Sequence, residues 1–502
     1  MGTIFTMQHI ITFLIPLPLL FFLFRIISNR RSSNKLKLPP GPYPWPIIGN
    51  ILQIGIKNPH ITFAEMAKVH GPLISLRIGQ RILIVGSSSI AASEILKTHD
   101  HALSGRDVSI LLRNKEPTFH NMNLVFTSEC DDGWRYLRNI YKTELLSGVV
   151  LESRANIRES KVLEMVKYLT SKEGEDIIIK DVMFVTAMNI LGNATLSIDL
   201  VDYEGNGVGA GIMDTVRRLV MIVAKPQLAD MFPVLGEWDL QGWYKQVMHI
   251  IEHELGAIWV DSIQRKRDDR SSSSSKDFVD VLIEKGFTNR QINPVMEELF
   301  AAGTETTSLT IEWFVAELLK NQQVLKKTRD EVMKHINGDI VHESDLVRLP
   351  YLDACFKETL RLHPAGPLLI PRKATQTCEV MGYTIPKDSQ ILVNVWAINR
   401  DLSMWDDPLT FKPGRFIESN LSYKGNDFGY LPFGSGRRMC PGETMASKVI
   451  LLTIANLILN FDWFVPDNVN PMEINMEEEM DIAMYKKEPL HVIFKLNKRF
   501  AN

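Results

Sequence analysis

The segment FGSGRRMCPG, residues 433–442, is the feature that most restricts what this chain can fold into. It places Cys440 in a turn, and the apolar run that follows predicts a helix over 443–459 that begins just beyond the thiol. Partial positive charge at a helix N-terminus lowers the pKa of a thiol, and a thiolate is a soft ligand for iron. The ordinary alternative for a single thiol is a buried structural cysteine. The turn also holds three glycines, which accept backbone conformations closed to other residues and let a flat cofactor approach the main chain: Gly434, Gly436 and Gly442.

The other cysteines and the net charge exclude several classes of protein. The chain has four cysteines and no CxxC pair, so the sequence predicts neither a disulfide framework nor a structural zinc site. A net charge of -3 on 502 residues gives no reason to expect nucleic acid as a partner.

The N-terminus predicts a membrane anchor. Residues 4–24 are almost unbroken apolar sequence, which as a helix reaches roughly 30 Å, the thickness of a bilayer core. Basic residues follow this run directly, beginning with Arg25, so the positive-inside rule leaves the rest of the chain in the cytosol. A cleaved signal peptide is the alternative, but its charges would precede the apolar run. We therefore expect a single-pass anchor over residues 1–27.

A basic and proline-rich hinge is expected next, over residues 28–50. Its sequence LPPGPYPWPIIGN holds five prolines, which remove amide donors and keep the backbone extended. A stiff connector to a globular body is the expected role, and a proline-rich partner ligand is the alternative. Beyond residue 50, helical periodicity dominates, with short strand-like runs at 73–78, 81–85 and 390–395, so the expected fold class is mostly α with small β-sheets.

Two helical segments carry residues that local stability does not explain. The segment 297–313 has Gly303, Thr304, Thr306 and Thr307 at its centre, although glycine inside a helix costs about 1 kcal/mol relative to alanine. A bend made by threonine hydroxyls bonded to carbonyls one turn back is one explanation. The second segment, KETLRLHP, places Glu358 and Arg361 on one face among apolar neighbours. A buried ion pair there would need a third partner to satisfy it.

The cysteine turn matches the signature FxxGxRxCxG at Phe433, Gly436, Arg438, Cys440 and Gly442. By these residues the chain resembles plant microsomal cytochromes P450, and the similarity runs from the proline-rich hinge to about Arg499. The resemblance implies a cytochrome P450 haem domain over 51–502, with an N-terminal anchor helix and haem b as cofactor. It makes Cys440 the proximal iron ligand.

The resemblance also implies roles for residues elsewhere. Glu305 and Thr306 match the acid and alcohol that relay protons over the haem, an alternative to the bending role of the threonines. Arg415, in PGRF, matches the arginine that completes the network of Glu358 and Arg361, although the glutamate of the family's PERF motif is missing here. The remaining expected haem contacts are Trp134, Arg138, Arg372, Phe433 and Arg438.

By this resemblance the chain is a monooxygenase of the endoplasmic reticulum membrane, with membrane lipid, a small-molecule substrate and NADPH-cytochrome P450 reductase as partners. A basic face for the reductase is expected from Arg135, Lys142, Arg437 and Lys448. The sequence as a whole resembles those of enzymes that hydroxylate or phenol-couple benzylisoquinoline alkaloids. The protonated amine of such an alkaloid would need a carboxylate in the pocket, and Asp481 and Glu116 are the candidates. The alternatives are a terpenoid or phenolic hydroxylase, a haem-thiolate isomerase that needs no reductase, and a non-catalytic haem or steroid-binding membrane protein.

Overall fold

A computed structural model describes residues 36–55, 57–111, 123–236, 238–268, 276–417, 419–466 and 469–497. The predicted anchor, residues 1–27, and the first part of the hinge lie outside these ranges. The long helices are α4 (Pro59–His70), α10 (Ala155–Ser171), α11 (Ile179–Leu196), α12 (Ile212–Ala224), α15 (Gly256–Asp268), α17 (Asn289–Lys320), α18 (Gln322–His335), α19 (Pro350–Leu362) and α21 (Glu443–Asn460). The shorter ones are α3 (Ile51–Ile54), α5 (Ser89–Ser93), α6 (Asp100–Leu103), α8 (Asp132–Ile140), α9 (Gly148–Ser153), α13 (Leu228–Met231), α14 (Trp243–His249), α16 (Phe278–Glu284) and α20 (Val395–Ile398).

Within the described ranges, four small sheets accompany the helices. The largest has the strand order β1 (Leu73–Ile78), β2 (Arg81–Gly86), β8 (Gln390–Val393), β5 (Arg372–Lys373) and β3 (Gly105–Arg106), and only β2 and β8 pair in parallel. The others are β4 (Asp176–Ile178), β12 (His491–Leu496) and β9 (Phe461–Phe464); β6 (Cys378–Val380) and β7 (Tyr383–Ile385); and β10 (Glu478–Met480) and β11 (Met484–Lys486). The predicted class, mostly α with small sheets, is confirmed, and the three strand-like runs become β1, β2 and β8.

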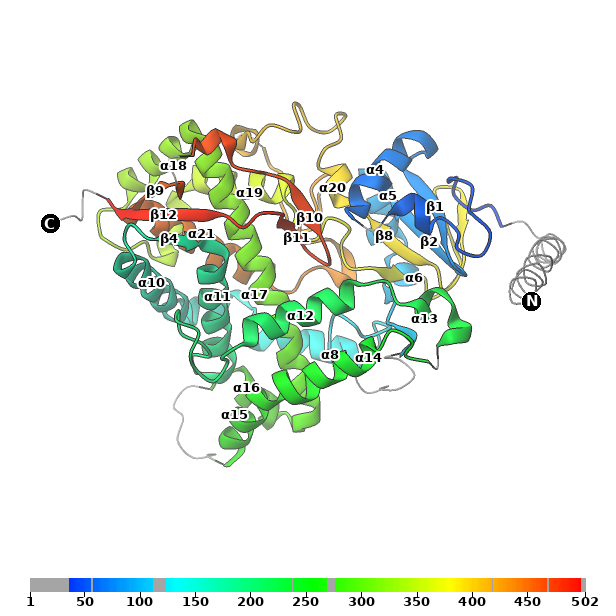
Figure 1. Ribbon diagram of the computed structural model, residues 1–502, viewed down its shortest axis with the longest axis horizontal. Helices are drawn as coiled ribbons and strands as arrows, with labels where there is room; N and C mark the ends of the chain where they lie inside the picture. Colours follow the sequence, from blue (N-terminus) through cyan, green and yellow to red (C-terminus); the bar gives the residue numbers. More distant parts are fainter. Residues whose placement is uncertain are drawn as a thin grey trace, which may run out of the picture.

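Helix α17 runs through the middle of the helical part of the molecule, while β1, β2 and β8 lie together toward one end of it, on the right in Figure 1. It contacts α11, α15, α18, α19 and α21. Its start is fixed by a capping box between Thr288 and Gln291, which satisfies amide groups that the first turn leaves free. Helix α19 ends at Leu362, as predicted from His363-Pro364, because a residue before proline avoids helical backbone angles.

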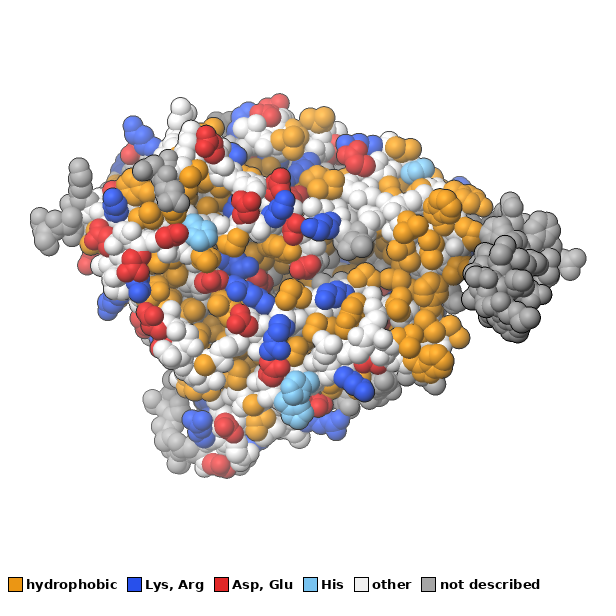
Figure 2. Space-filling model, viewed as in Figure 1, with side chains coloured by type: hydrophobic (Ala, Val, Ile, Leu, Met, Phe, Trp, Pro, Cys, Tyr) orange, Lys and Arg blue, Asp and Glu red, His pale blue; other side chains and the backbone are white. Residues whose placement is uncertain are grey.

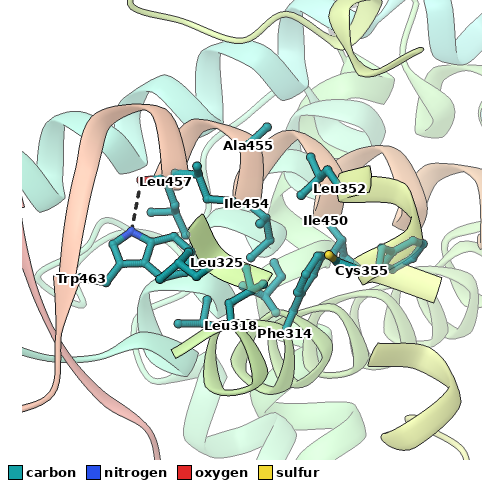
Figure 3. Packing of buried hydrophobic residues seen from close by; sticks show 14 of the residues in the cluster. Phe314, Leu318, Leu325, Leu352, Cys355, Ile450, Ile454, Ala455, Leu457 and Trp463 are labelled. Carbon is teal, nitrogen blue, oxygen red and sulfur yellow. Dashed lines mark hydrogen bonds between the residues drawn. The ribbon is translucent and has the colours of Figure 1, made fainter. Parts of the chain in front are cut away.

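The main apolar core lies between α17, α18, α19 and α21. Figure 3 shows Phe314 and Leu318 of α17 packed with Leu325 and with Ile454 of α21. Helix α21 is, among the described helices, the one long and apolar enough to cross a membrane, yet 78% of it is buried inside the protein, as expected of a core helix. Cys355 belongs to this core, where burial raises the pKa of its thiol to about 12. Cys355 is therefore a buried structural cysteine.

The described part of the hinge, residues 36–50, forms no helix, as predicted, but it does more than connect. It lies along β1: the backbone N–H of Ser75 donates to Pro40 O at 2.9 Å, and that of Asn50 donates to Arg77 O. A Cβ at Gly41 would lie 2.0 Å from the carbonyl oxygen of Ser75, so glycine is required for this close approach. The proline-rich segment is thus fixed to the body of the protein.

Candidate haem site

The cysteine turn is held by backbone geometry at its two ends. The N–H of Cys440 donates to Phe433 O at 3.0 Å, which closes the loop, and Gly434 and Gly436 have φ of 70° and 72°. A Cβ at Gly436 would also lie 2.4 Å from the carbonyl oxygen of Leu96. The predicted unusual backbone conformation is confirmed at these two glycines, and the approach of a cofactor to them stays a prediction. Gly442 differs, because its φ is -89°; a Cβ there would meet nothing within 4 Å, so its contribution is open space and not an unusual conformation.

The Cys440 thiol lies at the start of α21, as predicted, but its electrostatics differ from the prediction. Burial raises the pKa of this thiol, and the N–H groups of Gly442 and Glu443 and the charge of Arg138 only partly oppose the shift. The backbone N–H groups at the helix N-terminus do lower the pKa of Cys440, as predicted. The net shift is nevertheless upward, so the predicted net direction is wrong. A buried thiol of this kind gives up its proton to a strong partner such as a metal ion.

Arg438 leaves the same loop and enters the protein interior. Its guanidinium donates to three carbonyl oxygens, those of Ser104 at 3.0 Å, Leu124 at 2.7 Å and Thr127 at 2.6 Å. It also lies over the ring of Trp134, at 4.8 Å from the centroid. The indole N–H of Trp134 donates to the same Leu124 oxygen at 3.0 Å, so helix α8 and the cysteine loop share one backbone partner.

Two further predicted arginines lie in the same region. Arg138, one turn beyond Trp134 on α8, donates to Met439 O at 2.6 Å, directly beside Cys440. Arg372 of β5 donates to Asp100 Oδ1 at 2.8 Å and to Ser435 O at 2.9 Å. Burial lowers the pKa of Arg138, Arg372 and Arg438. Segments far apart in the sequence therefore bring three cations to the cysteine loop, of which Arg372 and Arg438 are buried and Arg138 is half-buried.

Sequence reasoning missed a fourth member, Arg106 of β3. It is buried and donates to Val125 O at 3.0 Å and to Ile370 O at 2.7 Å, and the charges of Arg438 and Arg372 help to lower its pKa. An arginine in a two-residue strand has no distinctive pattern. Because Asp100 and Glu298 are the acidic groups that act on these four arginines, the region carries excess positive charge. It fits the two carboxylates of a haem, since guanidinium groups bind carboxylates in fixed geometry.

The centre of α17 carries the threonine-rich segment. The hydroxyls of Thr304, Thr306 and Thr307 donate to carbonyls four residues back, and Thr306 Oγ1 lies 2.6 Å from Ala302 O. This is the bonding expected of a helix that threonines bend, while a proton-relay role for Thr306 stays a prediction. Ala302 itself is exposed, although much of α17 around it is buried. The helix therefore presents an open face at this point.

Glu305, the second predicted relay residue, is engaged elsewhere. Its Oε1 lies 3.5 Å from Lys180 Nζ on α11, and its Oε2 is buried without a hydrogen-bond partner among the described residues.

Glu358, Arg361 and Arg415 form the predicted buried network. Arg361 donates to both oxygens of Glu358, at 2.7 and 2.9 Å, and Arg415 Nε donates to Glu358 Oε1 at 3.0 Å. The side chains of Glu358 and Arg361 are fully buried, and Arg361 also donates to Asn399 O and Pro408 O. All three expected members meet, and backbone groups complete their hydrogen bonds.

Other predicted residues lie in less revealing places. Phe433 is half-buried and packs edge-on against Tyr423. Asp481 is exposed in the turn between β10 and β11, and Glu116 lies outside the described residues. In the predicted basic face, Arg135 pairs with Asp132, Arg437 pairs with Asp100 at 3.4 Å, and Lys448 pairs with the buried Glu343, which also binds Arg158. Lys448 therefore does not belong to a free basic surface, while Lys142 is exposed.

Comparisons with known proteins agree with this geometry. The family model described as Cytochrome P450 matches residues 39–494. The chain is 45% identical to a probable (S)-N-methylcoclaurine 3'-hydroxylase isozyme 2 of Coptis japonica, over 96% of this chain and 97% of that protein. It is 43% identical to (S)-N-methylcoclaurine 3'-hydroxylase isozyme 1 of Papaver somniferum, over 92% of this chain and 96% of the relative. Corytuberine synthase of Coptis japonica is 41% identical, over 94% of this chain and 95% of the relative.

Proposed function

The chain belongs to the cytochrome P450 family, whose monooxygenases carry haem on a cysteine thiolate, and from this premise we propose that Cys440 is that ligand. The observation that carries the proposal is a group of four arginines at the cysteine loop: Arg438 belongs to the loop, Arg138 and Arg372 donate to its carbonyls, and the charge of Arg106 acts together with those of Arg372 and Arg438. Haem supplies the activation of O2 with electrons that derive from NADPH.

The chain's own residues then have defined tasks. Arg106, Arg138, Arg372 and Arg438 would hold the haem carboxylates, and Trp134 supports Arg438 through its ring. Thr306 and Glu305 would move protons on the open face of α17. For Thr306 this requires its hydroxyl to leave Ala302 O, and for Glu305 the buried, unpartnered Oε2 is the available oxygen.

The proposed substrate is a benzylisoquinoline alkaloid, which the enzyme hydroxylates or phenol-couples. Support comes from the named activities of the relatives, which include a 3'-hydroxylase of (S)-N-methylcoclaurine and a corytuberine synthase, and which align with nearly the whole chain. The test is incubation of the full-length enzyme with reductase, NADPH, (S)-N-methylcoclaurine and 18O-labelled oxygen gas.

The label separates the two reactions. Hydroxylation places one labelled atom in the product, whereas phenol coupling removes two hydrogens and adds no oxygen. Consumption of a terpenol or a simple phenol, with no product from the alkaloid, would replace this substrate class. Turnover without reductase would point to an isomerase.

We further propose that the protein lies on the endoplasmic reticulum membrane and receives electrons from NADPH-cytochrome P450 reductase. Figure 2 shows hydrophobic side chains gathered at the end of the molecule that carries β1 and β2. Exposed apolar residues of the hinge and of the span after α13 include Tyr43, Trp45, Ile47, Val234 and Trp238. Met231 O accepts the N–H of Gln80 at 3.0 Å, which places α13 beside the β1–β2 turn. This surface would contact lipid.

Charge reversal tests the reductase contact. Lys142→Glu should raise the reductase concentration needed for half-maximal turnover, and added salt should do the same for the wild type. Lys448→Glu is unsuitable, since it would break the ion pair with Glu343. An unchanged reductase requirement in Lys142→Glu would remove this residue from the contact.

A further inference from the structure

Glu298 of α17 is a carboxylate with no role in the proposed binding of haem or in the proposed proton relay. Its Oε2 accepts the backbone N–H of Val125 at 2.6 Å, and its Oε1 accepts the hydroxyl of Tyr141 at 3.2 Å. Tyr141 begins the π-helical turn that follows α8. The carboxylate is therefore fixed in one orientation by donors from two other segments.

Helical spacing places Glu298 on the same face of α17 as the predicted relay. Glu298, Ala302 and Thr306 follow one another at intervals of four residues, which brings them above one another along the helix. Ala302 is exposed and both Glu298 and Thr306 are half-buried, whereas Val295, Met296 and Phe300 are buried. The carboxylate thus borders the open face on which Thr306 lies.

The neighbouring carboxylates do not have this position. Glu305 faces Lys180, Asp481 is exposed in its turn, and Glu297, next to Glu298 in the chain, is buried on another side of α17, where the charge of Glu252 acts on it. Of the carboxylates described on this stretch of α17, Glu298 is the one in line with Ala302 and Thr306.

With haem bound, the two haem carboxylates would offset the charges of the arginines that act on Glu298, and the surroundings of Glu298 would then suit the arrival of a cation. Burial raises the pKa of Glu298 to about 7, against hydrogen bonds from Val125, Tyr141 and Leu124 and the charge of Arg438. A carboxylate has about four lone-pair sites, so these three donors leave one for another partner. An ammonium group that enters beside it would offset the desolvation of both charges.

We propose that Glu298 receives the protonated amine of the substrate. This inference rests on the proposed function, in which the substrate is an amine-bearing alkaloid, and it names the group that recognises the amine. Glu298 also accepts the backbone N–H of Val125, so the same carboxylate would bind the amine and fix the backbone of the segment 123–127. The proposal replaces Asp481 and Glu116 as the residues expected to meet the amine.

The test compares two adjacent carboxylates and two ligands. Full-length haem enzyme is titrated with (S)-N-methylcoclaurine and with the uncharged N-acetyl analogue of the same skeleton, and binding is followed by the shift in the haem spectrum. In Glu298→Gln the Kd for the amine should rise by about tenfold or more, while the Kd for the neutral amide stays within about twofold. Glu297→Gln is the matched control and should change neither.

Each other outcome overturns the proposal in a different way. An equal loss of affinity for both ligands in Glu298→Gln would show that Glu298 fixes the backbone at Val125 and is not the counter-ion of the amine. An unchanged Kd for the amine in Glu298→Gln would place the amine elsewhere. If the wild type responds to a terpenol and not to the amine, the proposed substrate class itself fails, and the inference fails with it.

If Glu298→Gln does not retain haem, the pH dependence of ligand binding in the wild type tests the proposal instead. Affinity for the amine should fall as the pH is lowered through about 7, because protonation removes the charge of Glu298, and affinity for the neutral amide should stay level. The groups that face Glu298 or whose charges act on it do not titrate there: the pKa of Tyr141 lies well above 10, and Arg106, Arg138 and Arg438 keep their charge. A level response for both ligands would contradict the proposal.

Discussion

Helix α21, which follows the cysteine loop, and helix α12, which follows α11 in the chain, are built in opposite ways. Most of α21 is buried, and the arginines beside its start are bonded to backbone carbonyls. On α12, only Ile212, Thr215 and Val216 are buried among the described side chains. The cysteine-loop side is thus fixed by many buried contacts, whereas α12 is largely half-buried or exposed, and its Arg217 and Arg218 pair with Asp181 and Glu254. Substitutions beside the cysteine loop should therefore act through cofactor binding and stability, whereas substitutions at the exposed positions of α12 should change stability little.

The largest effect is expected at Cys440. Cys440→His should abolish the red-shifted Soret band that thiolate-ligated haem shows in reduced, carbon monoxide-treated protein, because imidazole replaces the thiolate. Cys378→Ser, at a half-buried cysteine of β6, is the control and should keep the band. A full band in Cys440→His would end the assignment of the ligand.

The buried network should come next. Glu358→Ala leaves Arg361 and Arg415 without their carboxylate and should destabilise the protein by roughly 3 to 5 kcal/mol, with loss of haem during purification. Glu65→Ala removes one member of an exposed pair with Lys68 and should change stability by less than about 1 kcal/mol. Chemical denaturation followed by tryptophan fluorescence measures the stability of both variants, and haem absorbance measures their haem content. Normal haem content in Glu358→Ala would show that the network is not needed.

Two glycines of the cysteine turn, Gly436 and Gly442, offer a sharper comparison. Gly436→Ala must adopt a left-handed conformation and overlap the Leu96 carbonyl, which should destabilise the protein by about 1 to 3 kcal/mol. Gly442→Ala meets neither obstacle and should leave the unfolding midpoint of the haem-free protein nearly unchanged. Equal midpoints for the two variants would contradict this account of the turn.

The smallest effect on structure is expected at Thr306. Thr306→Ala should bind haem and substrate normally yet form less product per NADPH consumed, by a factor of up to about a hundred, the lower end of what a positioned proton donor contributes. Thr307→Ala, whose hydroxyl bonds Gly303 O in the same way, should keep the wild-type ratio. Equal ratios in the wild type and Thr306→Ala would remove Thr306 from the relay.

Local patterns anticipated much of this molecule. The strands β1, β2 and β8, the start of α21 beside Cys440 and the end of α19 before Pro364 follow from periodicity and from proline and glycine, because these depend on neighbouring residues only. The meeting of Glu358, Arg361 and Arg415 was also expected, although there the family resemblance supplied the third partner.

The sequence by itself determined where the cysteine loop and the helix after it lie in the chain, and the mostly helical class of the fold. Only the tertiary structure decided what surrounds them. Arg106 joins the buried cations because β3 pairs with β5, and Lys448 is unavailable to a partner because α21 packs where Glu343 can reach it. The net direction of the Cys440 pKa was likewise decided by burial, which outweighs the helix terminus. Desolvation and long-range charge depend on everything packed around a group, and no local pattern in a chain records that.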